Sequence, residues 1–409
     1  MKKFDLLCIQ CGKPHPALTT RCDEGCTSLL RTRYEEKSFR PTEDPGLFRF
    51  LDWLPCQSRT ETQVGPVVFR SESLGQWLGH DNLYFAFVGY WPERGAWNST
   101  GTFKDLEAYP TLLGLLDHGK RRIILASAGN TARAFAHASG LLDFTTYIVV
   151  PEAMLFRLWM PPSGASRGNV KLIAVRESAD YAQAIRISDE LAQRYSLDSE
   201  GGAKNVARRD GMGTVVLEAA RILGRLPDHY FQAIGSGTGG IAAYEASLRL
   251  LGDSRFYGQR LPRLHLSQNA PFLPIYQAWK GEPWTPVPAA DLFANILANR
   301  TPPFAIRGGV SDALEATGGR VYSVESSEAI EVSREFQRLE GIDLDPAAAV
   351  ALASLRQAVA SGRVHRDELV LVNLTGGGLE RLQRDFDCRT LEPDLVIDES
   401  SLDSFETVL

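Results

Sequence analysis

Strand-like runs alternate with helix-like stretches from residue 120 onward, and this alternation constrains the fold more than any other feature. The expected strands are short and apolar, and they lie at 122–126, 146–150, 170–175, 230–234, 264–266, 321–324 and 369–373. Helix-like stretches such as 180–194 and 241–251 separate them. Alternating strands and helices form mainly parallel sheets that helices cover on both faces. The sequence therefore predicts an α/β fold.

The bulk properties of the chain narrow its class. At 409 residues it exceeds the usual size of one core, so two or more domains are expected. A net charge of −6 argues against nucleic acid as a partner, because phosphate neutralisation needs a basic face. The sequence shows no signal peptide, no apolar run that could span a bilayer and no disulfide scaffold, since six cysteines are few for this length. We therefore expect a cytoplasmic enzyme.

Three short motifs lie at expected strand-to-helix junctions. They read Gly-Thr-Phe-Lys-Asp at 101–105, Ser-Ala-Gly-Asn-Thr at 127–131 and Gly-Ser-Gly-Thr-Gly-Gly at 235–240. Ligands of parallel α/β folds bind beyond the carboxyl ends of the strands, where these motifs fall. A lysine amine, an asparagine loop and a glycine-rich turn in this order predict a site for pyridoxal phosphate (PLP).

The glycine-rich turn also satisfies the dinucleotide pattern G-x-G-x-x-G. A dinucleotide site usually has an acidic residue at the end of the next strand, whereas 264–266 here is followed by Ser-Gln-Asn. The two hydroxyls of the turn suit a single phosphate, so PLP is favoured over a nicotinamide or flavin cofactor. The residues expected to hold the phosphate are Gly235, Ser236, Gly237, Thr238 and Gly239.

Lys104 is one of only nine lysines, and it precedes Asp105 at an expected helix start. The alternative to a catalytic role is a solvated lysine, but a cation is unfavourable at the positive end of a helix dipole. The same position, if buried, would lower the pKa of the amine. A lowered pKa is what an imine-forming, proton-transferring lysine needs.

The asparagine loop and the last strand supply further candidates. Asn130 is expected to contact the cofactor, although a plain helix cap is also possible. Ser127, Gly129 and Thr131 could hold a substrate carboxylate at the same helix start. Thr375 is the expected partner of the pyridine nitrogen, with a simple turn as the alternative. A hydroxyl there, unlike a carboxylate, does not force that nitrogen to be protonated, which favours elimination and replacement at the β carbon.

The segment 201–211 is rich in glycine and carries three cations close together. It could be a hinge that brings a cation to an anionic substrate group, or merely a solvated basic loop. The candidate substrate-binding residues in it are Lys204, Arg208 and Arg209.

Four cysteines lie within the first 26 residues, in the order Cys8, Cys11, Cys22 and Cys26. Two such pairs can place four thiolates at the corners of a tetrahedron, which suits structural zinc. His15 is a substitute ligand, and four unligated thiols are the alternative.

With these motifs the chain resembles the fold-type II PLP enzymes, and among them the threonine synthase-like group. The resemblance covers residues 1 to about 385 and rests on 102–105, 127–131 and 373–379. It implies a tryptophan synthase β-like fold of two doubly wound αβα domains behind a zinc-ribbon-like module, and commonly a homodimer. The domains implied are the module at 1–34, a large PLP-binding domain at 35–110 and 215–409, and a small mobile domain at 111–214.

Within that group the chain is most similar to the cysteate synthase branch, through 48–55, 89–93, 205–215 and 228–242. That resemblance implies β-replacement on O-phospho-L-serine by sulfite, giving L-cysteate and phosphate, with Lys104 as cofactor attachment point and general base. Threonine synthase activity, or another nucleophile on phosphoserine, are the alternatives within the enzyme class. A zinc-ribbon binding protein with an inactive enzyme body is the alternative outside it.

Overall fold

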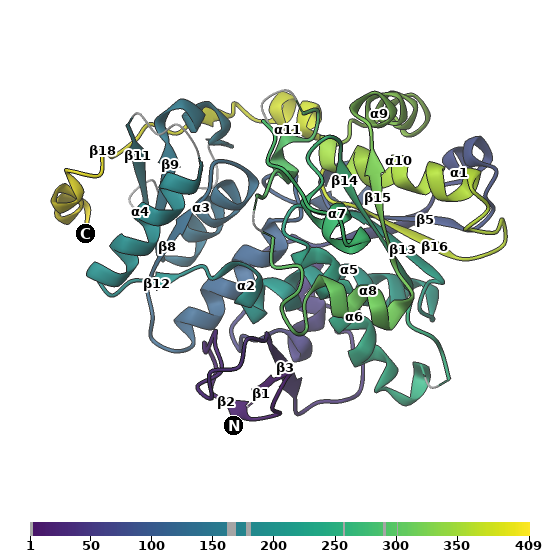
Figure 1. Cartoon of the computed structure of the whole chain (residues 1–409), viewed down its shortest axis with the longest axis horizontal. Coiled ribbons are helices and arrows are strands. Elements are labelled where there is room, and N and C mark those ends of the chain that lie inside the picture. The colour runs from purple at the N-terminus through teal and green to yellow at the C-terminus, as the bar shows by residue number, and fades with distance from the viewer. Residues whose placement is uncertain (1–2, 162–168, 177–180, 257, 289–291, 301) are drawn as a thin grey trace.

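The computed structural model describes residues 3–161, 169–176, 181–256, 258–288, 292–300 and 302–409. The chain forms a larger and a smaller α/β lobe side by side, with a small N-terminal ribbon beneath them (Figure 1). No helix within these ranges is long and apolar enough to cross a membrane.

The larger lobe contains a six-stranded sheet in the order β15-β14-β13-β16-β5-β4. Its strands are β4 (Val67–Arg70), β5 (Leu83–Phe87), β13 (His229–Ala233), β14 (Arg263–Asn269), β15 (Arg320–Val324) and β16 (Val370–Leu374). All neighbours are parallel except β4 and β5. Every residue of the central β13 and β16 is buried, as expected for parallel strands covered on both faces.

Helices cover both faces of this sheet (Figure 1). On one face lie α1 (Glu72–Leu78), α9 (Ser326–Glu340) and α10 (Pro346–Ala360), and on the other α5 (Val206–Leu223), α6 (Thr238–Leu251) and α8 (Val310–Thr317). The helices α7 (Pro274–Lys280) and α11 (Leu379–Asp385) flank the lobe. The expected doubly wound arrangement is confirmed here.

The smaller lobe contains a five-stranded parallel sheet in the order β12-β8-β9-β11-β18. Its strands are β8 (Arg122–Ala126), β9 (Thr145–Pro151), β11 (Val170–Val175), β12 (Asp198–Ser199) and β18 (Leu395–Ile397). Alternate residues of β8 and β9 belong to two separate hydrophobic clusters. One cluster includes α3 (Asn130–Leu142), and the other includes α4 (Tyr181–Arg194) and η9 (Leu402–Val408).

The N-terminal ribbon is antiparallel, with β1 (Phe4–Cys8) between β2 (Pro14–His15) and β3 (Leu30–Tyr34). It is tied to the start of α5, because Thr32 and Tyr34 both donate hydrogen bonds of 2.7 Å to Asp210 Oδ2. The ribbon therefore packs on the helices of the larger lobe.

Two boundaries differ from the sequence-based division of the chain. The C-terminal strand β18 pairs with β11 of the smaller sheet, although 215–409 was assigned to the larger domain. Helix α5 crosses the expected boundary after residue 214 without a break, and it packs on α2 (Asp105–Leu116) and α6. Short paired strands also lie outside the two sheets: β6 (Tyr90–Trp91) with β7 (Ala96–Trp97), and β10 (Trp159–Met160) with β17 (Arg389–Thr390).

Candidate active site

Lys104 immediately precedes α2, and its side chain is largely buried, with 16% exposed. Its Nζ lies 3.2 Å from Glu107 Oε2, one turn along the same helix. Burial, and after it the nearby charge of Arg208, lowers the pKa of the amine to about 8, although Glu107 opposes the shift. A lysine in this setting exchanges a proton close to neutral pH, as the sequence-based interpretation requires.

A buried chain of alternating charges extends from this amine. Glu107, with no exposed side-chain surface, also lies 3.0 Å from the Nε of Arg208. Arg208 Nη1 in turn donates to both carboxylate oxygens of Glu200 at 3.1 Å. Arg208 reaches α2 because α5 packs closely against that helix: an added Cβ on Gly211 would lie 1.9 Å from Leu106 O.

The expectation of a solvated or hinge-like loop over 201–211 is wrong for its second half. Helix α5 begins at Val206, and Asn205 caps it by accepting from the amides of Ala207 and Arg208. Arg208 and Arg209 are therefore buried on the first turn of a helix. An asparagine cap is the signal in the sequence that could have placed this boundary.

The three basic candidates of that segment have different environments. Arg208 lies beside the lysine, as described above. Lys204 is partly exposed in the short helix η6 (Gly202–Lys204). Arg209 Nε donates to Glu245 at 2.8 Å, and its terminal nitrogens donate to the backbone carbonyls of Ala203 and Leu30. Arg209 therefore joins α5, α6 and the ribbon, and we leave it out of the proposed substrate contacts.

The turn after β16 lies directly against the lysine segment. Phe103 N donates to Thr375 O at 2.9 Å, and Thr102 forms an antiparallel bridge with Gly376. Thr375 is buried, with 4% exposed. The expected partner of the pyridine nitrogen and the expected cofactor lysine are thus brought together by backbone pairing.

The asparagine loop follows β8 and opens α3. Ser127 Oγ accepts from Ala132 N at 3.1 Å, and Gly129 O accepts from Arg133 N at the same distance. The amides of Asn130 and Thr131 have no such partner within the described ranges. These two N–H groups at a helix N-terminus can bind a carboxylate.

The glycine-rich turn connects β13 to α6 and has the features of an anion cradle. Of the amides from Gly235 to Ile241, those of Thr238 and Ile241 have partners in the described part of the chain, at Ser236 Oγ and Gly237 O. The remaining amides point from a turn and a helix start and can donate to a phosphate. Close packing explains the glycines, since a Cβ on Gly239 would lie 2.0 Å from Gln232 Nε2. The turn therefore fits a phosphate group.

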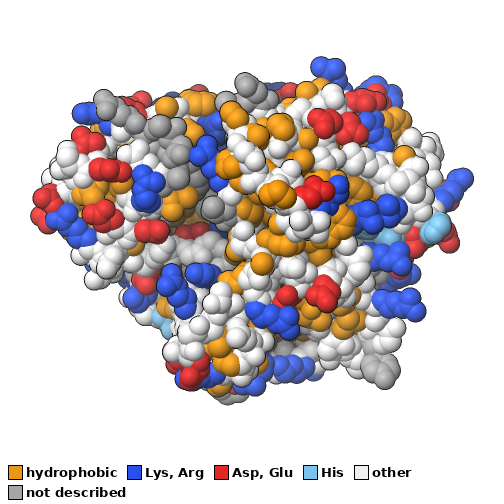
Figure 2. Space-filling model, viewed as in Figure 1, with side chains coloured by type: hydrophobic (Ala, Val, Ile, Leu, Met, Phe, Trp, Pro, Cys, Tyr) orange, Lys and Arg blue, Asp and Glu red, His pale blue; other side chains and the backbone are white. Residues whose placement is uncertain are grey.

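The glycine-rich turn and the asparagine loop are both approached by one short segment outside the predicted motifs. An added Cβ on Gly235 would lie 2.9 Å from Leu297 O, and one on Gly129 would lie 3.5 Å from Ile296 Cδ1. Both contacts come from η8 (Asn295–Leu297), which belongs to neither sheet. Figure 2 shows the surface hollowed between the two lobes, with hydrophobic side chains gathered over the region of α7. No motif in the sequence marks η8 as part of the site.

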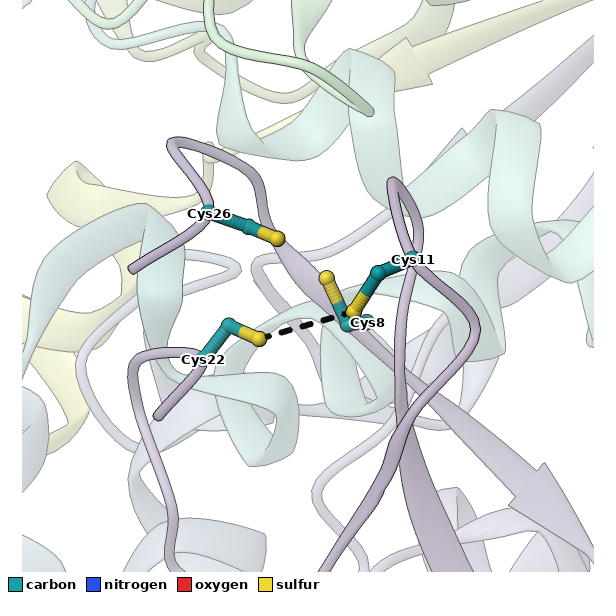
Figure 3. Close-up of side chains that lie close together, drawn as sticks. All are labelled: Cys8, Cys11, Cys22 and Cys26. Carbon is teal, nitrogen blue, oxygen red and sulfur yellow. Dashed lines mark hydrogen bonds between the residues drawn. The ribbon is translucent and has the colours of Figure 1, made fainter. Parts of the chain in front are cut away.

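The four ribbon cysteines converge on one point (Figure 3). Their sulfur atoms all lie within 4.8 Å of one another, and Cys11 Sγ and Cys22 Sγ are 3.7 Å apart. Thiolates about 2.3 Å from a tetrahedral zinc ion would be about 3.8 Å from each other, so the cluster is compatible with structural zinc. His15 Nδ1 lies 3.6 Å from Asp23, and with Cys22 the pair forms an overlapping group of possible ligands.

Comparison with known proteins decides the family. A family model described as "Pyridoxal-phosphate dependent enzyme" matches residues 88–376, which include all three motifs and Thr375. The chain belongs to this family. It is 46% identical over 403 residues to the cysteate synthase of Methanosarcina barkeri, covering 96% of both chains. It is 47% identical to that of Methanocella paludicola, covering 97% of this chain and 95% of the relative. Within the PLP enzymes the chain thus belongs with the cysteate synthases.

Solved structures support the fold. A PLP-dependent aspartate racemase superposes with a TM-score of 0.59 at 18% identity, covering 77% of this chain and 91% of that chain. Maize serine racemase gives 0.58 at 18% identity, covering 78% and 90%. At this identity the likeness concerns the fold alone. Together with the family match, it confirms the fold-type II fold expected from the sequence.

Proposed function

We propose that this enzyme replaces the phosphate of O-phospho-L-serine with sulfite, giving L-cysteate and phosphate. The similarity to cysteate synthases over nearly the whole chain supports this reaction. The observation that carries it in the structure is the buried Lys104 amine, 3.2 Å from Glu107 and beside the cation Arg208. A proton-transferring amine next to a positive charge suits a reaction whose leaving group and nucleophile are both anions.

The residues of the three motifs and Thr375 are the proposed cofactor contacts. Lys104 would hold PLP through its amine, the 235–240 turn would bind the phosphate, and Asn130 and Thr375 would contact the ring. When bound, PLP supplies an electron-withdrawing ring that stabilises negative charge at the substrate Cα. The Thr375 hydroxyl, if it contacts the ring nitrogen, does not force that nitrogen to be protonated. The ring then withdraws electrons less strongly, which favours loss of a β substituent.

Substrate binding and proton transfer are assigned to residues of the chain itself. Ser127 and the amides of the asparagine loop bind the substrate carboxylate and orient the Cα–H bond. Lys104 removes the Cα proton and later returns it, while Glu107 holds the protonated amine in place. The Cβ–O bond breaks with its electron pair leaving on phosphate, and the sulfur lone pair of sulfite forms the new Cβ–S bond. No oxidant or reductant is needed.

Arg208 and Lys204 are the proposed contacts of the departing phosphate. Arg208 already has two carboxylate neighbours, Glu107 and Glu200, so its charge is partly neutralised in the structure. A phosphate group would compete with these carboxylates for the guanidinium. Lys204, on the neighbouring short helix, is partly exposed and can approach the anion from solvent.

We further propose that the cysteine cluster binds zinc, that the enzyme is a cytoplasmic protein and that it forms a homodimer. Six free cysteines support a reducing compartment. Zinc content, fractionation and light scattering test these three points separately.

The reaction is tested by offering O-phospho-L-serine and O-phospho-L-homoserine to the PLP-loaded enzyme, each with sulfite, sulfide or water. We expect cysteate, identified by mass, from phosphoserine and sulfite alone. Threonine from phosphohomoserine and water would support the threonine synthase alternative instead. If cysteine forms with sulfide but no cysteate forms with sulfite, the result would support β-replacement on phosphoserine with a nucleophile other than sulfite. No product in any reaction would favour an inactive binding protein.

A further inference from the structure

Arg133 is a buried cation on α3, one turn after Asn130. Its side chain is 4% exposed, and its Nη2 donates to Asn130 Oδ1. The guanidinium lies over the indole of Trp159, with its central carbon 3.9 Å from the ring centroid. Its Nε and Nη1 have no hydrogen-bond partner among the described residues. A buried guanidinium with unpaired N–H groups is unusual and costly.

Two carboxylates, Asp105 and Asp345, lie within electrostatic reach of Arg133. Neither forms an ion pair with it in the described part of the chain, and its Nε and Nη1 stay unpaired there. Each has other partners: Asp105 accepts from the amide and hydroxyl of Thr100 at 3.0 Å, and Asp345 accepts from Ala347 N and from the side chain of Asn130. Burial raises the pKa of Asp105 to about 7, so part of its population is uncharged at neutral pH.

The surroundings place Arg133 within the site described above. Asn130, its hydrogen-bond partner, belongs to the asparagine loop. Asp105 directly follows Lys104 in the chain. Asp345 N donates to Gly376 O, beside Thr375. Arg133 is thus surrounded by segments that carry the proposed carboxylate contact, the lysine and the ring contact.

We propose that Arg133 binds a tetrahedral oxyanion at the substrate β carbon, through the N–H groups that Asn130 leaves free. The two sources of such an anion are the phosphate of the incoming substrate and the sulfite that replaces it, and this assignment rests on the proposed function. Arg208 is paired with two carboxylates, whereas Arg133 has no ion pair among the described residues, so Arg133 offers the stronger net positive charge. Trp159 packs against the face of the guanidinium, so the N–H groups, which lie in the guanidinium plane, stay available to donate.

The test measures anion binding separately from turnover. Inorganic phosphate, sulfite and sulfate are titrated by calorimetry into the full-length PLP-loaded protein and into Arg133→Met, Arg133→Lys and Arg121→Met. Arg121 is an exposed cation of the same lobe, at the other end of β8 and paired with Asp143, and it serves as the matched control. Thermal melting verifies that each variant is folded, and Arg133→Lys keeps the charge should Arg133→Met fail to fold.

We expect Arg133→Met to weaken anion binding by roughly tenfold or more, Arg133→Lys to weaken it less, and Arg121→Met to leave it unchanged. KM for the anion that Arg133 contacts should rise by a similar factor. A higher KM for phosphoserine identifies the substrate phosphate as that anion, and a higher KM for sulfite identifies sulfite. Unchanged anion affinity in the folded Arg133 variants would overturn the proposal. Oxyanion binding that depends on Arg133, in a protein that forms no cysteate, would instead contradict the proposed reaction and leave this inference standing.

Discussion

Lys104 and Glu107 form a buried ion pair across the first turn of α2, with Nζ and Oε2 3.2 Å apart. The same carboxylate oxygen lies 3.0 Å from Arg208. Glu107 therefore sets both the position of the reactive amine and the local balance of charge. Its negative charge raises the pKa of Lys104, while burial and Arg208 lower it to about 8.

The first prediction concerns the protonation of Lys104 in cofactor-free protein. Competitive acylation at a series of pH values, read at the Lys104 peptide, should give a midpoint near 8, well below the roughly 10.4 of a free lysine. Glu107→Gln removes a charge that favours the ammonium form, so the midpoint should move to lower pH, by about one unit. Glu282→Gln, beside the exposed Lys280, is the control and should leave the midpoint unchanged. A midpoint that rises in Glu107→Gln would contradict this arrangement of charges.

The second prediction concerns the glycine-rich turn. A Cβ on Gly239 would meet Gln232 Nε2 at 2.0 Å. Gln232 cannot move aside easily, because its Oε1 accepts from Tyr230 at 2.7 Å and from Asn373 at 3.1 Å. Gly239→Ala should therefore distort the turn and weaken PLP binding by at least roughly tenfold, measured by cofactor absorbance during dialysis.

Gly252→Ala, at the other end of α6, is the matched control. An added Cβ there meets its nearest atom, Arg249 O, at 3.2 Å, so only a small adjustment is needed. It should retain PLP. Equal cofactor affinity in both variants would mean that the turn does not hold the phosphate.

The third prediction concerns the ribbon. The purified protein should contain one zinc ion per chain, measured by mass spectrometry of the metal. Cys22→Ser should lose it and lower Tm by roughly 5 °C or more, because metal binding contributes to folding and the ribbon packs on α5. Cys388→Ser, outside the cluster, should keep both the metal and the melting temperature. Wild-type protein that is purified without zinc, and whose Tm Cys22→Ser leaves unchanged, would refute the zinc site.

The sequence predicted the strands of the two sheets well where strong local signals coincide. The expected strands at 122–126 and 170–175 agree with β8 and β11, because apolar β-branched runs there are bounded by turns. The pairing of β18 with the smaller sheet could not be predicted, since a three-residue strand has no local signal and its partner lies far back in the chain.

The site was predicted only in part, for a similar reason. Lys104, Asn130 and the glycine-rich turn belong to motifs that local chemistry explains. In the structure, η8 approaches both the glycine-rich turn and the asparagine loop, and α2, which follows Lys104, packs on α3. Glu107 and Arg133 were missed, because each looks like an ordinary charged residue on a helix. Their significance comes from burial and from the residues they face, and neither property can be read from a single sequence. Their roles, like those of the motif residues, stay predictions until they are tested.

The covalent attachment of the cofactor to Lys104 tests the account most directly. The PLP-loaded protein is reduced with borohydride and digested, and the peptide that carries the added pyridoxyl phosphate mass is sequenced. We predict that this mass lies on Lys104 and is lost in Lys104→Ala, while Lys120→Ala, which changes an exposed lysine paired with Asp198, retains it. The same adduct on another lysine, or its persistence in Lys104→Ala, would contradict the account.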